Sequence, residues 1–216
     1  MKSPSFFNWS GGKDAALALY KAMLSEKYDI RYLLTSFNSV HNRVSMHGVR
    51  RSLTEAQAAS IGLPLTAVEL SEDPSMEEYE SKMREALTGL RDGGCYPAIY
   101  GDIFLEDLRA YREEKLRPGG LECVFPLWQT DTAVLIKEFI HAGFKAVIAC
   151  VNAAFLDRSF CGRLIDESFI NDLPDNVDPC GENGEFHSFV FDGPIFKEPI
   201  KFKQGRIIYK QSLLSG

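Results

Sequence analysis

The sequence lacks the features that mark several large protein classes. It has five cysteines and no C-x-x-C pair, so a redox or zinc motif of that kind is disfavoured and reduced thiols are expected. No apolar run approaches the roughly 20 residues that cross a bilayer. The segment Met1 to Phe7 has one lysine and only a brief apolar stretch, unlike a secretory signal. We therefore expect a cytoplasmic protein.

Basic residues are also fewer than acidic residues. The 24 Lys and Arg residues against 30 Asp and Glu give a formal charge of −6, which disfavours a broad nucleic-acid-binding surface but leaves a local basic patch open. The histidines lack the H-E-x-x-H spacing, which argues against zinc. With 216 residues, 45% of them hydrophobic, the chain suits one compact α/β unit or one unit with a small appended domain.

Strand-like and helix-like segments alternate along most of the chain. The predicted strands are Ser5–Trp9, Asp29–Asn38, Leu65–Leu70, Pro97–Ile103, Val124–Trp128 and Ala146–Val151. The predicted helices are Lys13–Leu24, Arg50–Ile61, Ser75–Leu90, Leu105–Leu116 and Thr132–Ala142. This alternation predicts an α/β fold, a doubly wound and mainly parallel Rossmann-like sheet with helices on both faces.

The alternation of strand-like and helix-like segments ends after Asn171. Asp172–Asn183 is dense in Pro, Asp, Asn and Gly, which predicts a loop. Strand-like segments follow at Phe186–Phe191, Ile200–Lys203 and Arg206–Gln211. We therefore expect a small C-terminal α+β section, with residues 1–128 forming a nucleotide-binding domain and 129–216 a substrate-side domain.

A glycine-containing loop is the strongest local signal. Ser10-Gly11-Gly12-Lys13-Asp14 follows the first predicted strand and begins the first predicted helix. Glycines let backbone N–H groups approach a phosphate, the helix N-terminus adds donors, and lysine neutralises charge. The spacing is neither G-x-x-x-x-G-K-[ST] nor G-x-G-x-x-G. The alternative is a plain turn in which Asp14 only favours the helix dipole.

This loop resembles the SGGxD loop of the PP-loop ATP pyrophosphatases. That resemblance implies an adenine nucleotide alpha hydrolase-like fold that holds ATP and its pyrophosphate on residues 10–15. The family motif usually ends in serine, whereas this chain has Ala15. One phosphate-binding hydroxyl is therefore missing, although the backbone cradle does not need it.

Further motifs narrow the resemblance. In order along the chain they are Ser45-Met46-His47, Gly101-Asp102-Ile103, Pro126-Leu127-Trp128, the run Cys180–Phe186, and Asp192-Gly193-Pro194. Together with the loop they resemble the diphthine–ammonia ligase (diphthamide synthetase) family across nearly the whole chain. The resemblance implies adenine recognition by the main chain near Met46, with His47 on the substrate side.

Asp102 is the candidate metal ligand. It ends a predicted strand at the carboxyl edge of the sheet, where open α/β folds bind ligands. A carboxylate there can hold Mg²⁺ against the triphosphate, with Gly101 beside the nucleotide. The alternative is a helix cap.

The run Glu182-Asn183-Gly184-Glu185 provides the candidate substrate loop. Its glycine allows a sharp bend that brings Glu182 and Glu185 toward one ligand, where they act as acid and base or orient an amine. The alternative is two solvated glutamates. Trp128 can line the substrate pocket, although a buried tryptophan is the commoner outcome.

His187 is a departure from the family. The diphthine ligases usually have Glu-Gly-Gly-Glu-Tyr-Glu-Thr, and here histidine replaces the third glutamate. This removes a negative charge that would face ammonia or a trimethylammonium group. The run is more similar to a sister subgroup, some of whose members are suspected of acting in corrinoid (cobalamin) metabolism.

The resemblance implies a reaction in two steps that uses ATP and Mg²⁺. A substrate carboxylate is adenylated with release of pyrophosphate, and ammonia then displaces AMP, with Lys13, Asp14, Glu182 and Glu185 as the catalytic residues. The expected partners are ATP, ammonia and a carboxylate-bearing small molecule or modified protein, without a membrane; homo-oligomerisation stays open. The alternatives are a tRNA-modifying PP-loop enzyme, a nucleotide-binding sensor, and a protein that kept the fold without the chemistry.

Overall fold

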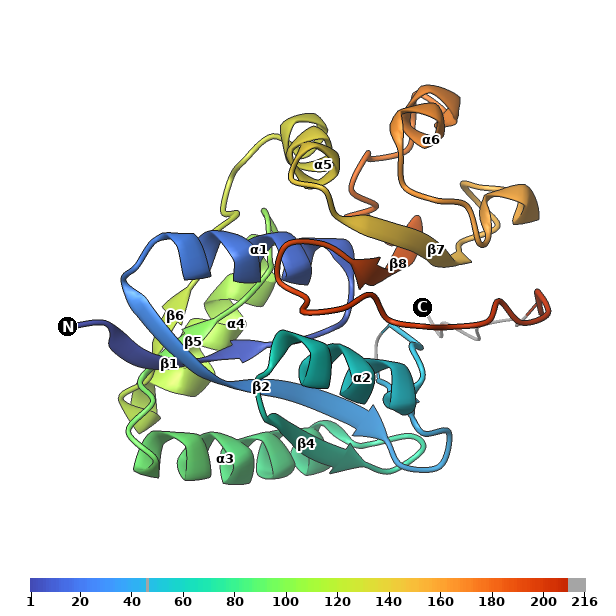
Figure 1. Ribbon diagram of the computed structural model, residues 1–216. Coiled ribbons are helices and arrows are strands. Elements are labelled where there is room, and N and C mark those ends of the chain that lie inside the picture. The colour runs from blue at the N-terminus through green and yellow to red at the C-terminus, as the bar shows by residue number, and fades with distance from the viewer. Residues whose placement is uncertain (46, 210–216) are drawn as a thin grey trace.

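The computed structural model describes residues 1–45 and 47–209 (Figure 1). The strands are β1 (Ser3–Asn8), β2 (Tyr28–Asn38), β3 (Arg43–Val44), β4 (Leu65–Leu70), β5 (Pro97–Ile99), β6 (Glu122–Val124), β7 (Lys145–Val151) and β8 (Phe186–Asp192). The α-helices are α1 (Lys13–Leu24), α2 (Arg51–Ile61), α3 (Met76–Asp92), α4 (Glu106–Leu116), α5 (Thr132–His141) and α6 (Glu167–Asp172). Two 3₁₀ turns are η1 (Arg117–Gly119) and η2 (Arg158–Phe160). No helix in these ranges is both long enough and apolar enough to span a membrane.

The main sheet is parallel, as predicted. Its strands run in the order β4-β2-β1-β5-β6, and the short β3 pairs antiparallel with the end of β2. In a parallel sheet the carboxyl ends share one edge, so the loops after β1, β2 and β5 meet there. This confirms the predicted α/β fold and places the loop Ser10–Asp14 at the ligand-binding edge.

Helices cover both faces of this sheet (Figure 1). On one face, α3 and α4 pack onto a core that contains Phe6, Leu34, Leu87 and Leu116. On the other face lie α1 and α2, whose partners include Phe7 and Leu33. Successive residues of β1 thus point to opposite cores, as the two-residue period of a strand requires.

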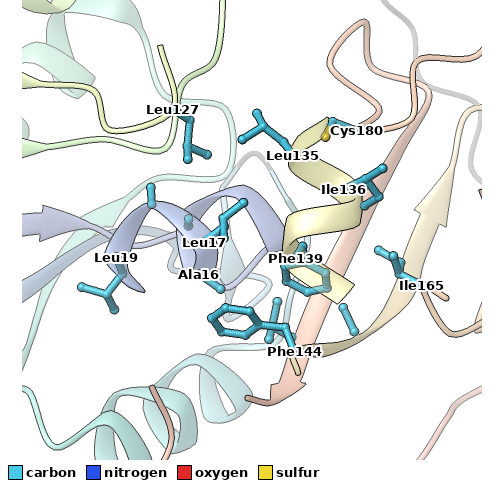
Figure 2. Packing of buried hydrophobic residues seen from close by; sticks show 14 of the residues in the cluster. Ala16, Leu17, Leu19, Leu127, Leu135, Ile136, Phe139, Phe144, Ile165 and Cys180 are labelled. Carbon is cyan, nitrogen blue, oxygen red and sulfur yellow. The ribbon is translucent and has the colours of Figure 1, made fainter. Parts of the chain in front are cut away.

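Helix α1 is the central layer of the molecule. Its sequence KDAALALYKAML is apolar almost all round, and Ala15–Leu19 and Ala22 are buried. A helix of that kind needs cover on two sides. Figure 2 shows Ala16, Leu17 and Leu19 beside Phe139 of α5 and Phe144, while the main sheet covers the other side.

The C-terminal strands differ from the prediction. Ala146–Val151 was expected in the parallel sheet, but β7 pairs antiparallel with β8 in a separate two-stranded sheet. The physical reason is α1, whose outer apolar side is covered by β7, β8 and α5. The small C-terminal section is therefore a second layer stacked on the first helix.

The predicted strands after residue 199 are wrong within the described residues. Ile200–Lys203 and 206–209 form no strand there, and Gln211 lies outside the described residues. Phe202 instead packs its ring against Phe189 and Phe191, with centroids 5.4 and 5.2 Å away. Side-chain packing thus holds this segment, with one backbone hydrogen bond from Ile200 N–H to the Phe191 carbonyl at 2.7 Å.

Two strands end earlier than predicted. β5 stops at Ile99 instead of Ile103, and β6 spans Glu122–Val124 instead of 124–128. After β5, a Cβ on Gly101 would lie 2.9 Å from the Ala15 nitrogen, so the chain passes against the first turn of α1. After β6, the Trp128 N–H donates to the Phe125 carbonyl at 3.2 Å, which closes a turn.

Candidate functional site

The loop Ser10–Asp14 connects β1 to α1 as predicted. Gly11 has a φ of 82°, which favours glycine, and Gly12 is the N-cap of α1. Ser10 Oγ accepts from the Gly12 N–H at 3.3 Å. The N–H groups of Asp14 and Ala15 donate to no other described residue. Together they leave an open set of donors at the positive end of a buried helix.

The C-terminal layer ties this loop down. Ser188 Oγ of β8 accepts from the Lys13 N–H at 3.0 Å, and the Val190 N–H donates to the Gly11 carbonyl at 3.0 Å. The loop is therefore fixed by a strand about 175 residues away in sequence. Because the Gly11 carbonyl is turned into this network, the side of the loop that faces a ligand is left to N–H donors.

Gln57 completes the network, and sequence reasoning missed it. This fully buried side chain of α2 donates from Nε2 to the carbonyls of Gly11 (3.0 Å) and Val190 (2.6 Å). Its Oε1 accepts from Trp9 Nε1 at 3.0 Å. A buried amide with every group used fixes its neighbours strongly. The only sequence signal was a glutamine at a position that a helix period would bury.

Gly101 lies against the backbone at the start of α1, which explains why this position has no side chain. A Cβ on Gly101 would lie 2.9 Å from the Ala15 nitrogen and 3.0 Å from the Ala15 Cα. Backbone atoms cannot move aside as a flexible side chain can. The structure thus places Gly101 against the phosphate loop, where it allows the strand end and the helix start to touch.

Lys13 is the central cation of the site. Its side chain is only 4% exposed, and Nζ lies 2.7 Å from the Asp14 carboxylate and 5.4 Å from the Phe186 ring centroid. Burial alone would lower the pKa of Lys13, but attraction to Asp14, Cys180 and Glu182 outweighs it and raises the pKa above its ordinary value. The lysine is therefore a permanent charge next to the loop.

The two glutamates of the Glu182–Glu185 segment have opposite environments. The pKa of Glu182 is raised to about 8 by burial and by the negative charges of Asp14, Asp178 and Asp102, against the attraction of Lys13. Glu182 thus faces the charged centre of the site. A carboxyl group with such a pKa can hold or release a proton near neutral pH.

Glu185 is fully buried and faces the loop itself. Its carboxylate accepts from the backbone N–H groups of Asp178 (3.0 Å) and Asn183 (2.8 Å) and from Asn183 Nδ2 (3.0 Å). Burial opposes its ionisation, yet these hydrogen bonds lower the pKa of Glu185 below its ordinary value. Its contacts support the shape of the loop, and an acid or base role for it stays a prediction.

Asn183 and Gly184 lie at the exposed turn of this loop. The Asn183 side-chain amide donates its hydrogen bond to the Glu185 carboxylate. Gly184 has a φ of 83°, a conformation that few other residues adopt. These two residues therefore shape the loop, and direct substrate contact by either stays a prediction.

The structure brings the two predicted substrate histidines together. The Nδ1 atoms of His47 and His187 are 3.3 Å apart, with ring centroids 4.7 Å apart and nearly perpendicular. Burial, His187 and Lys13 lower the pKa of His47 to about 4, and burial and Lys13 also lower that of His187. Both rings are therefore neutral at pH 7. Met46 lies outside the described residues.

Asp102 has a cationic partner in this structure. Arg112 of α4 donates from Nε and Nη2 to its two carboxylate oxygens at 2.7 and 3.3 Å. The same guanidinium lies 4.2 Å from the Tyr100 ring centroid. Among the described residues, no group of three or more His, Cys, Asp or Glu side chains forms a metal cluster. A metal role for Asp102 stays a prediction.

Trp128 belongs to an aromatic cluster with Phe125 and Tyr100. Its ring is 5.4 Å from that of Phe125, and the Arg109 guanidinium lies 4.7 Å from its centroid. Phe125 in turn stacks on Tyr100 at 5.6 Å. Trp128 is half-buried, and a substrate contact stays a prediction.

Comparisons with known proteins agree with this geometry. The model of the diphthamide synthase N-terminal domain matches residues 1–122, and that of the diphthamide synthase C-terminal domain matches residues 131–213. Among curated proteins, the chain is similar to diphthine–ammonia ligases. The Homo sapiens protein is 32% identical over 110 residues, which are 48% of this chain and 41% of that protein.

Two further relatives match over shorter stretches. The Danio rerio diphthine–ammonia ligase is 35% identical over 79 residues, 34% of this chain and 31% of that protein. The Schizosaccharomyces pombe enzyme is 31% identical over 97 residues, 43% of this chain and 16% of that protein. The matched region thus spans less than half the length of each relative. With both family models matched in order, the chain belongs to the diphthamide synthase family.

Proposed function

We propose that this chain is an ATP-dependent ligase that adenylates a substrate carboxylate, releases pyrophosphate and transfers ammonia to form an amide. The observation that carries the proposal is the buried Lys13 at the open N-terminus of α1, within a loop that β8 and Gln57 hold in place. The match to the diphthamide synthase family and the relatives named as diphthine–ammonia ligases also support the proposal.

The loop fits a polyphosphate. Gly11 and Gly12 present no side chain, Asp14 and Ala15 offer N–H groups, and Lys13 supplies a fixed charge. Donors that are already oriented stabilise charge on a leaving group without reorganisation. We assign the pyrophosphate of ATP to this loop. The Ser188 hydroxyl, which holds the Lys13 N–H, supports the loop from the C-terminal layer.

The acidic side chains around Lys13 suit a divalent cation. Burial and the repulsion of Asp14, Asp178 and Asp102 raise the pKa of Glu182 to about 8. Carboxylate oxygens are the ligands that Mg²⁺ prefers, and a bound Mg²⁺ would offset both this repulsion and the charge of the phosphates. We assign Asp14 as the candidate ligand, with Asp102 available if Arg112 releases it, and Glu182 is left free for proton transfer.

The reaction has two displacements. A carboxylate oxygen of the acceptor bonds to the α-phosphorus while the bond to the β-phosphate oxygen breaks, giving an acyl adenylate and pyrophosphate. Ammonia then bonds to the acyl carbon, and AMP leaves. The attacking nitrogen loses a proton, which Glu182 can accept in its ionised form because its pKa of about 8 lies near neutral pH.

His47 and His187 lie on the acceptor side of this assignment. With their Nδ1 atoms paired, the two neutral rings leave one N–H donor and one nitrogen acceptor, both at Nε2, without adding charge beside Lys13. An uncharged pair of this kind can orient the acceptor or the incoming ammonia. Gly184 and Asn183 shape the adjoining loop.

Nucleotide product analysis tests the proposal. The purified protein is incubated with ATP, Mg²⁺, ammonium and a panel of carboxylates that includes diphthine-bearing elongation factor and corrinoid acids. We expect AMP and pyrophosphate in the presence of one panel member, and their loss in Asp14→Ala. ADP and phosphate as products, or turnover that persists in Asp14→Ala, would overturn the assignment.

A further inference from the structure

A hollow of about 430 Å³ lies beside the first turn of α2, apart from the phosphate loop. Three arginines line it together with His41, Asn42, Ser52 and Glu55, and the Glu55 carboxylate pairs with Arg51 at 2.9 Å. We name the set Arg43, Arg50 and Arg51 the arginine hollow. The chain as a whole carries a charge of −6, so a concave site with three guanidinium groups is a local exception.

Two of the three arginines in the arginine hollow have no carboxylate partner among the described residues. Arg51 is neutralised, since its guanidinium pairs with Glu55 at 2.9 Å and Glu69 at 2.6 Å. Arg43 uses one nitrogen on the Gly48 carbonyl at 2.6 Å, and Arg50 is exposed. In the described part of the chain, no carboxylate forms an ion pair with Arg43 or Arg50. The remaining guanidinium N–H groups are free to bind an anion.

The start of α2 adds to this positive field. Arg50 is the N-cap, it makes no side-chain capping bond, and the first turn contains no acidic residue. The other five α-helices begin with a side-chain cap or with Asp or Glu in the first turn. In α2, arginines stand where an acid normally balances the dipole. A bound oxyanion would supply the missing negative charge.

The arginine hollow connects to the candidate site through a small hairpin. The backbones of Arg43 and Arg50 form an antiparallel bridge, and the Val44 N–H donates to the Val49 carbonyl at 2.8 Å. His47 lies in the turn of this hairpin and contacts His187 of β8. The arginines thus lie at the base of the hairpin, and the substrate-side histidine lies at its tip.

We propose that the arginine hollow binds an oxyanion, phosphate or carboxylate, carried by the acceptor. The acceptor would then be an acidic molecule with a second anionic group besides the carboxylate that is adenylated. This inference rests on the proposed function, because it names the class of substrate for that same site. Arginine forks match the planar or tetrahedral oxygens of both anions, which makes bidentate binding the expected mode.

Titration followed by backbone NMR tests binding directly. The probes are inorganic phosphate and citrate, which separate phosphate from carboxylate. Shifts at Arg50, Arg51 and Ser52 are fitted separately from those at residues 10–15, so that binding at the Ser10–Asp14 loop is distinguished from binding at the hollow. We expect saturable shifts of the Arg50, Arg51 and Ser52 amides with at least one probe. Arg50→Gln should weaken that affinity about tenfold, the loss of one charge-assisted bond. Arg84→Gln, an exposed arginine on α3, is the matched control and should change nothing.

Kinetics then links the hollow to the acceptor. With the acceptor found by product analysis, Arg50→Gln should raise its KM about tenfold while the KM for ATP stays within about twofold. Absence of saturable shifts with both probes, or equal effects of Arg50→Gln and Arg84→Gln, would overturn the inference. These results differ from failure of the proposed function, which would show as absence of AMP in the unmodified protein.

Discussion

The starts of α1 and α2 are alike in place and different in construction. Both lie at the carboxyl edge of the main sheet, and both carry cationic side chains at an N-terminus without a side-chain cap. At α1 the lysine is buried and paired, and the loop is fixed by Gln57 and β8. At α2 the arginines Arg43 and Arg50 keep unpaired N–H groups, and Arg50 is exposed.

Under the two proposals above, the helix starts are two kinds of anion site on one fold. Buried hydrogen bonds hold the phosphate loop in one shape, which suits a ligand that never varies. Exposed guanidinium groups keep their rotamer freedom, which suits a ligand whose shape differs or whose binding must be weak. The predictions below test whether the start of α1 binds an invariant ligand through a fixed loop, and the start of α2 a variable ligand through exposed arginines.

The largest effect is expected at Lys13. Lys13→Gln removes the fixed charge beside the loop, and AMP formation should fall about 100-fold or more, as for loss of one preorganised group. Steady-state release of pyrophosphate measures it. Lys21→Gln, on the same helix but paired with Glu138 on the surface, is the matched control and should retain activity. Activity of Lys13→Gln within about threefold of the unmodified protein would remove Lys13 from the site.

Gln57 is expected to have the next largest effect. Gln57→Met keeps the volume but leaves the Gly11 and Val190 carbonyls without this donor, which should cost about 2–4 kcal/mol of unfolding free energy. ATP affinity should fall about tenfold, because the loop loses its fixed shape. Urea denaturation and calorimetric titration measure the two effects.

Ser60→Ala is the control for Gln57. Ser60 is also a buried polar residue of α2, but its hydroxyl bonds to Glu198 far from the loop. It should lower stability by about 1–2 kcal/mol and leave ATP affinity unchanged. Equal losses of ATP affinity in both variants would reduce Gln57 to a structural role.

Glu182 should give a pH-dependent effect. Because burial and Asp14 raise its pKa to about 8, the folded state keeps a proton that the unfolded state releases above the ordinary glutamate pKa of 4.5. Glu182 therefore destabilises the fold increasingly as pH rises from about 5 to 8. Glu182→Gln should be the more stable form at pH 8, by on the order of 1–2 kcal/mol after solvent screening, with the difference vanishing near pH 4.

Glu185→Gln is the opposite case and serves as the comparison. The pKa of Glu185 is lowered, so its ionised form stabilises the fold above the ordinary glutamate range, and this is lost as pH falls through the folded value. Denaturation at pH 5, 7 and 8 should show Glu185→Gln to be less stable at pH 7. The same sign for both variants at pH 8 would contradict the environments described here.

The smallest effect is expected at Arg51. Its pairs with Glu55 and Glu69 are partly exposed, so Arg51→Gln should lower the unfolding free energy by about 0.5–1 kcal/mol. This would show that the arginine hollow is not a structural element of the fold. A loss of several kcal/mol, measured by urea denaturation, would instead make the hollow part of the structural framework.

The sequence predicted the first layer of the fold well, because its signals are local. The alternation of β-branched strands and capped helices gives the parallel sheet, and the bounds of Lys13–Leu24 and Leu65–Leu70 are confirmed. β7 was placed in the wrong sheet, since a strand sequence does not say which edge it joins. Its position is decided by α1, whose outer apolar face is visible only after the main sheet has formed.

The positions of the candidate site residues were predictable in part for the same reason, while their roles stay predictions. A glycine pair before a helix marks a phosphate loop locally, and the structure does bring His47 to His187. No local sequence signal indicates that Gln57 donates a hydrogen bond to the Gly11 carbonyl, or that Arg112 pairs with the Asp102 carboxylate. Likewise, the sequence does not distinguish Glu182 from Glu185. Only in the folded loop does Glu182 face the charged groups around Lys13, while the Glu185 carboxylate accepts hydrogen bonds that support the loop.

The hydrogen bond between Lys13 N–H and Ser188 Oγ has a consequence for biosynthesis. During translation the phosphate loop emerges among the first residues, whereas the strand that fixes it emerges some 175 residues later. Contacts of such long separation form late in folding. A ribosome-bound chain that has not yet produced β8 therefore lacks the contact that fixes the Ser10–Asp14 loop, and on the proposed function ATP binding would arise only near the end of synthesis.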